Sequence, residues 1–250
     1  MNLRPALVAA MVSASPLGAQ TAEAHIALGD RDRAARDAVG ALRHYQDAIL
    51  ADPTSAGALW RAALGSVDLG EFDDDSRDSL YRLGEQYARR AVHADSQSSM
   101  AHFALARALG RRALSLGARD RVKYADEVRR GALESLALDS LNAGALAVMG
   151  MWHANVMRLS GISRFLAKKL LGGQVFDEAS WEEAASYLER AAALEPERVV
   201  HRINLAAVYA DIGDAAKARS QYELALRLPQ TDFNDPNYQA QAEAGLRQLP

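Results

Sequence analysis

The chain has 250 residues, about one in five of which is alanine, with 49% hydrophobic, 24% charged and 6% aromatic residues and no cysteine. The lack of cysteine excludes disulfides and thiolate metal sites, and the alanine-rich, aromatic-poor composition favours helices over a β-sandwich or barrel. A formal net charge of -3 gives no general attraction to nucleic acid or to an anionic membrane, so we expect no nucleic-acid partner.

Residues 1–19 have the pattern of a secretory signal peptide. Arg4 supplies a positive start, residues 6–12 are apolar, and small residues follow as far as Ala19. The segment is too short to span a bilayer, and we expect cleavage near Ala19, with residues 22–24 as a rival site. The sequence thus predicts an exported protein, periplasmic if bacterial, with no transmembrane segment in the mature chain. An uncleaved anchor or a cytosolic N-terminus is the alternative.

A short sequence motif recurs five times, each time near the end of a predicted helix. Aligning its small residue gives positions at spacings of 43, 44, 56 and 34 residues, namely Ala48, Ala91, Ser135, Ala191 and Ala225. The last spacing is the period of the tetratricopeptide repeat (TPR), a pair of antiparallel helices, and the longer spacings indicate insertions. We therefore predict an all-α, TPR-like helical-repeat solenoid of about five helix pairs. A generic bundle of long helices does not explain five recurrences in phase.

The predicted solenoid occupies residues 22–250 and ends in a capping helix at 235–249, which covers the open end of the stack. Its repeats fall at about 22–55, 56–98, 99–142, 143–198 and 199–232. Ser180 and Glu183 have the spacing of a capping box, in which the glutamate reaches back to the serine N–H. Asp235 before a proline is the pattern of a helix N-cap.

In such a solenoid the first helix of each pair lines the concave face, and counting within each repeat identifies the inward-facing residues. These residues predict a mostly apolar binding groove with a single cation. The counted positions are Trp60, Leu64, Val67, Met100, Phe103, Arg107, Ala147, Met151, Ala154, Ile203, Ala207 and Asp211. The candidate binding residues among them are Trp60, Leu64, Met100, Phe103, Arg107, Met151 and Ile203. A large apolar surface indicates a bound partner, an apolar ligand or a covering segment of the same chain, here the longest insertion or the C-terminal helix.

The longest insertion, residues 157–178, carries apolar residues at helical spacing together with a cluster of cations. The cations are Arg158, Arg164, Lys168 and Lys169, and no acidic residue precedes Asp177. A basic amphipathic helix either lies on anionic lipid or packs its apolar stripe into the groove. For a helix this short, packing is the favoured interpretation.

The sequence contains no recognisable catalytic or metal-binding motif. Its six histidines lack the spacings of helical zinc ligands, and there is no phosphate-binding lysine loop, dinucleotide fingerprint or nucleophile elbow. The aspartates at 73–75 lack the alternating ligands of a calcium loop. His153 is expected to be a hydrogen-bonded packing residue. We predict a non-enzymatic protein without metal or cofactor, with an active site assembled from distant residues as the alternative.

Several segments, in order and in spacing, resemble the regulator of microtubule dynamics proteins. They are residues 58–62, 136–139, 145–152, 170–173, 178–184 and 225–229. The resemblance implies a non-enzymatic TPR-like protein, with microtubule association in the family and membrane tethering and phospholipid binding in one branch. Residues 153–156 replace the family's usual aromatic-acidic pair, so the role of that pair is not transferred. An exported chain would not meet tubulin, so microtubule binding is not transferred either.

Two functions of the groove follow from these patterns. The first is recognition of a protein or peptide by an interaction module or scaffold, with Trp60, Phe103 and Met151 as apolar anchors and Arg107 as the polar contact. The second is binding or transfer of a lipid or another apolar ligand, with the basic insertion at the mouth of the groove.

Overall fold

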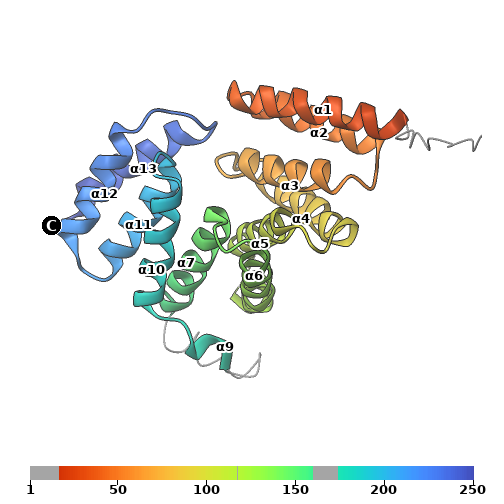
Figure 1. Ribbon diagram of the computed structural model, residues 1–250. Coiled ribbons are helices and arrows are strands. Elements are labelled where there is room, and N and C mark those ends of the chain that lie inside the picture. The colour runs from red at the N-terminus through yellow and green to blue at the C-terminus, as the bar shows by residue number, and fades with distance from the viewer. Residues whose placement is uncertain (1–16, 117, 160–173) are drawn as a thin grey trace, which may run out of the picture.

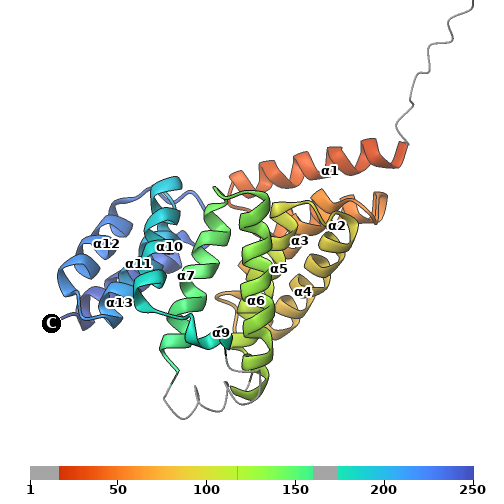
Figure 2. The same ribbon diagram turned by 60° about the horizontal axis from the view of Figure 1, so that its bottom comes forward.

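The computed structural model describes residues 17–116, 118–159 and 174–250, and all regular structure in those ranges is helical. Five helix pairs follow one another along the chain and a single helix ends it (Figures 1 and 2). The pairs are α1 (Leu17–Ala34) with α2 (Ala38–Ala51), α3 (Ala56–Gly70) with α4 (Arg77–Ala94), α5 (Ser99–Leu114) with α6 (Ala118–Leu138), α7 (Ala143–Met157) with α10 (Trp181–Leu194), and α11 (Val199–Asp211) with α12 (Ala215–Arg227). Helix α9 (Gln174–Asp177) precedes α10, and α13 (Asp235–Gln248) is last. The predicted all-α, TPR-like solenoid is confirmed.

The recurrent small residue of each repeat lies on the buried face of the second helix of its pair. All five positions, Ala48, Ala91, Ser135, Ala191 and Ala225, are 0% exposed. Small side chains at these positions let neighbouring helices approach closely. Ser135, the polar member, donates its hydroxyl to the carbonyl of Ser99 on α5 at 2.9 Å. The alanine-rich composition therefore reflects close packing between helices.

Helices α7 and α10 form a normal pair although the longest insertion separates them in the sequence. Their contact is centred on Gly150, where an added Cβ would lie 2.6 Å from Cγ of Leu188 and 2.9 Å from the carbonyl oxygen of Ala184. Only glycine fits so close an approach. Leu188 is itself fully buried. The insertion thus leaves the repeat geometry intact.

Two helix starts differ from their predictions. Ser180 Oγ accepts from the N–H of Glu183 at 3.1 Å, but the N–H of Ser180 donates to Nδ1 of His153 at 3.4 Å instead of to Glu183, because α7 lies against this turn. The predicted capping box is therefore half correct. Asn234, and not Asp235, occupies the N-cap of α13. The carboxylate of Asp235 accepts instead from two amides of the loop that folds back over it.

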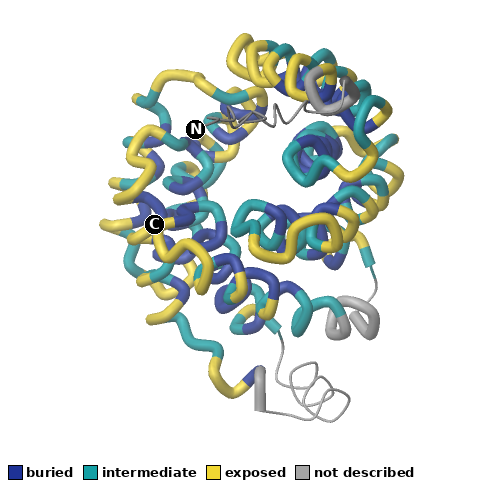
Figure 3. The backbone as a smooth tube through the Cα atoms, turned by 45° about the vertical axis from the view of Figure 1, so that its right-hand side comes forward, coloured by how far each residue is buried: buried dark blue, intermediate teal, exposed yellow. Residues whose placement is uncertain are grey.

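Helix α13 packs against α11 and α12 and buries Tyr238 and Ala242. Figure 3 shows the helices curling into an almost closed ring.

Within the described ranges no helix is both long enough and apolar enough to cross a membrane. The predicted signal peptide falls mainly on residues 1–16, outside the described residues, and stays a prediction. Most of the basic insertion lies in residues 160–173, which are also outside them.

Candidate functional site

A groove of about 430 Å³ lies on the concave side of the solenoid. The first helices of four repeats, α3, α5, α7 and α11, contribute to its lining. Seven of the twelve positions predicted from the repeat register line it, namely Trp60, Leu64, Met100, Phe103, Arg107, Ala147 and Met151. Val128, Trp152 and Phe176 extend the apolar wall toward α6 and α9. The groove therefore brings together side chains that lie more than a hundred residues apart in the sequence.

Five of the predicted positions do not line the groove, namely Val67, Ala154, Ile203, Ala207 and Asp211. Val67 and Ala154 are fully buried, and the predicted place of Ile203 is also wrong. Ile203 is buried, at 7% exposure, in the core formed by α10, α11 and α12. The groove side of α11 presents Val200 and Asn204 instead. Successive positions on a helix point about 100° apart, so an error of one residue in the counted register moves a side chain from the groove to the core.

The C-terminal clasp, residues 230–238, forms one wall of the groove. Nδ2 of Asn234 donates to the backbone carbonyl of Asp68 at 2.8 Å. The ring of Tyr238 meets that of Phe72 edge-on, with 5.4 Å between centroids. In Figure 1 the loop before α13 reaches toward α1 and α3. The clasp thus joins the end of the chain to its second repeat and gives the ring its closure.

Ion pairs hold the clasp from both sides of the ring. Asp232 lies 2.8 Å from Arg198 at the start of α11 and 3.7 Å from Arg33 at the end of α1. Burial acts to raise the pKa of Asp232, but Arg198 and Arg33 lower it below its ordinary value. Asp232 is therefore ionised at neutral pH and connects the first repeat with the last.

We expect Asp232→Asn to lower the free energy of unfolding by about 1.5–3 kcal/mol at pH 7, because it removes a charge-assisted hydrogen bond from a mostly buried site. The pKa of Asp232 is depressed on folding, so this stabilisation is fully present above its ordinary value of 3.8 and is lost as the pH falls through the folded value. Denaturant titrations at pH 7 and pH 3 measure the difference. Asp126→Asn, at an exposed helix pair, is the control. An equal effect of Asp232→Asn at both pH values would contradict the assignment.

The end of the groove near α3 holds a cluster of buried charges. Arg107 lies 2.6 Å from Asp68 and 3.5 Å from Glu71, and Arg111 also pairs with Glu71. Burial alone would lower the pKa of Arg107, but the charges of Asp68 and Glu71 raise it above its ordinary value. Arg107 therefore lies in the groove lining as predicted, but its charge is already neutralised within the protein. The groove lining is mostly apolar along α5 and α7, apart from Arg107 and Arg111 of α5, and it is charged where the clasp meets α3.

His153 is a packing residue, as its sequence context predicted. Its ring is 5% exposed, stacks on Tyr187 with 5.6 Å between centroids, and accepts from Ser180 through Nδ1. Burial lowers its pKa, which favours the neutral form that this acceptor role requires. The adjacent Trp152 donates through Nε1 to the carbonyl of Ala125 at 2.8 Å and ties α7 to α6.

One of the four predicted cations of the insertion lies in the described part of the chain. Arg158 pairs with Asp211 at the end of α11, with Nε 2.9 Å from the carboxylate, and thereby connects α7 with the last repeat. Arg164, Lys168 and Lys169 lie outside the described residues.

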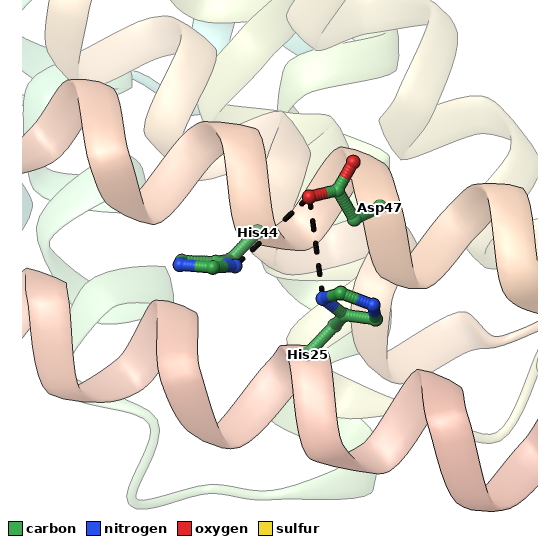
Figure 4. A group of neighbouring side chains, drawn as sticks. All are labelled: His25, His44 and Asp47. Atoms are coloured by element: carbon green, nitrogen blue, oxygen red, sulfur yellow. Dashed lines mark ion pairs between the residues drawn. The ribbon is translucent and has the colours of Figure 1, made fainter.

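A second group of polar side chains lies on α1 and α2 (Figure 4). It consists of His25, His44 and Asp47, whose possible ligand atoms lie within 4.8 Å of one another. Sequence patterns missed it because His25 and His44 belong to different helices, whereas the recognised histidine motifs place both ligands on one helix. The spacing of His44 and Asp47, three residues apart on one helix face, is the only local signal.

A family model for regulator of microtubule dynamics protein 1-3 matches residues 21–250 of the chain. The chain belongs to this family. No curated protein sequence gives a match. TPR proteins are among the solved structures similar to this family member. A thermophilic TPR protein of Thermus thermophilus has a TM-score of 0.62 at 20% identity, with 89% of this chain and 99% of that chain covered.

Two further structures resemble this regulator of microtubule dynamics family member more loosely. PilF of Pseudomonas aeruginosa has a TM-score of 0.49 at 18% identity, with 93% of each chain covered. YrrB, described as a TPR protein with an unusual peptide-binding site, has a TM-score of 0.45 at 14% identity, with 94% of this chain and 100% of that chain covered. At these identities the likenesses concern the fold alone.

Proposed function

We propose that this family member is a non-enzymatic interaction module that binds a short apolar segment of another protein in the concave groove. The observation that carries the proposal is the groove itself, about 430 Å³ in volume and lined by apolar side chains from three successive repeats. A volume in the range of roughly 300–1,000 Å³ suits a few side chains or a small ligand better than a large folded surface. The clasp also limits the size of the ligand, because it forms one wall of the groove.

The chemistry of the lining supports an apolar segment with a polar flank. Met100 and Met151 are unbranched and adapt to ligands of varied shape. Trp60, stacked at 4.1 Å under the guanidinium of Arg61, offers a rigid apolar face. Asn204 lies on the groove side of α11 and is available to hydrogen-bond the backbone of a bound segment. Arg107 would act indirectly, by holding the charged end of the groove in place.

The proposal is tested with a peptide selected from a displayed random library on the purified protein. Met151→Arg places a charge in the apolar part of the groove and is expected to weaken the affinity for that peptide at least tenfold. Leu141→Arg, at an exposed turn residue outside the groove, is the matched control and is expected to bind normally. Both variants should keep the melting temperature of the wild type. Unchanged affinity in Met151→Arg, or equal loss in both variants, would contradict the proposal.

Capture of a lipid or another apolar ligand is the second candidate, and the same apolar lining favours it. Native mass spectrometry of protein purified from its own host is the test. Co-purified lipid that is lost in Phe103→Ala would support it, whereas protein without bound lipid would count against it.

Export, to the periplasm if the host is bacterial, is proposed from the pattern of residues 1–19. N-terminal sequencing of the mature protein is expected to begin near Gln20, and an intact Met1 would contradict export by cleavage.

A further inference from the structure

We infer that the first repeat carries a binding site for a divalent transition-metal ion, formed by His25 on α1 and by His44 and Asp47 on α2 (Figure 4). Nδ1 of His25 and Nδ1 of His44 each lie 4.0 Å from the same oxygen, Oδ2 of Asp47. The two rings lie side by side, with 5.9 Å between centroids and 30° between their planes. Two imidazole nitrogens and one carboxylate oxygen therefore converge on one point between the helices. None of the three residues lines the groove.

The two nitrogens that face Asp47 lack the partners that buried polar atoms normally have. Nδ1 of His25 and Nδ1 of His44 are both shielded from solvent and neither makes a hydrogen bond. A separation of 4.0 Å is too long for a hydrogen bond to the carboxylate. Leaving such an atom unsatisfied costs about 1–3 kcal/mol. An ion bound to all three ligand atoms would satisfy both nitrogens at once.

A carboxylate behind His44 favours the same arrangement. Oδ2 of Asp32 lies 3.5 Å from Nε2 of His44, on the side of the ring away from Asp47. A carboxylate at this position favours the tautomer with its proton on Nε2, which leaves the lone pair of Nδ1 free for a metal ion. Gly40 leaves room for the carboxylate of Asp32, because an added Cβ at Gly40 would lie 2.9 Å from Oδ2 of Asp32.

The ligand set indicates the class of ion. Imidazole nitrogen suits zinc, copper and nickel, whereas magnesium and calcium prefer oxygen ligands throughout. Two ligands of one tetrahedral zinc ion lie about 3.4 Å apart, so the side chains would have to close by about 0.6 Å from their 4.0 Å separations. The three side chains are partly exposed, so they have room to make this adjustment. A bound ion would cross-link α1 to α2.

The test is isothermal titration of the untagged full chain with ZnCl2, with MgCl2 as the hard-cation comparison. We expect one saturable zinc site per chain and no binding of Mg²⁺. His25→Ala and His44→Ala should each weaken zinc binding at least tenfold, and Asp47→Asn should weaken it as well. His93→Ala, at an exposed histidine near the end of α4, is the matched control and should bind like the wild type.

A thermal-shift measurement keeps the inference falsifiable if a variant is less stable. Zinc should raise the melting temperature of the wild type and of His93→Ala, but not that of His44→Ala or Asp47→Asn, each compared with its own metal-free sample. Absence of saturable zinc binding by the wild type, or binding by His25→Ala and His44→Ala with unchanged affinity, would overturn the inference.

Discussion

Replacing Arg107 by alanine is expected to lower the free energy of unfolding by about 3–5 kcal/mol, the usual cost of removing one partner from a buried ion pair. The side chains of Arg107, Asp68 and Glu71 are 19%, 12% and 6% exposed, so solvent does little to screen the carboxylates that the substitution leaves behind. Asp68 also supplies the carbonyl that receives Asn234, so we expect the clasp to loosen with it. Urea denaturation followed by circular dichroism measures the loss.

The matched control for Arg107→Ala is Arg82→Ala, which removes an exposed pair with Asp78 within α4. Exposed pairs of this kind contribute little, about 0.5 kcal/mol or less. If Arg107→Ala kept the stability of the wild type and lost only peptide affinity, Arg107 would instead be the free partner-binding cation that the sequence alone predicts. The experiment therefore separates a structural role from a recognition role.

The second large effect is expected for Leu188→Ala, with a loss of about 2–5 kcal/mol. Leu188 is fully buried and fills the space above Gly150, where α10 meets α7 across the longest insertion. Its truncation leaves a cavity that the close backbone contact prevents from collapsing. Thermal and urea unfolding measure the effect, with Leu50→Ala as the control because Leu50 is 80% exposed. Similar stabilities of the two variants would show that the fourth repeat is not packed as described.

The helix pairs were predictable because their signals are local and recur. The five small residues near the helix ends repeat in phase, and every one of them is buried. The position of the groove followed from the same register, since the first helix of each TPR faces the concave side. The error at Ile203 shows the limit of counting, because one residue of drift is enough to turn a side chain into the core.

The remaining features depend on contacts that sequence periodicity does not encode. The hydrogen bond from Asn234 to Asp68 spans 166 residues, and neither residue belongs to a recurrent pattern. The pairing of Arg107 with Asp68 requires knowledge of how α5 packs on α3. The convergence of His25 on His44 and Asp47 likewise depends on the packing of α1 on α2. A sequence signal existed only for His44 and Asp47, which share one face of α2.

The central claim, that the concave groove is the binding site, is tested most directly by methyl NMR of the chain labelled at its six methionines. Met100 and Met151 line the groove, whereas Met149 is 2% exposed and packs in a separate cluster. On titration with the selected peptide, the methyl signals of Met100 and Met151 are predicted to shift in a saturable manner while that of Met149 stays in place. Saturable binding that leaves Met100 and Met151 unshifted would contradict the account.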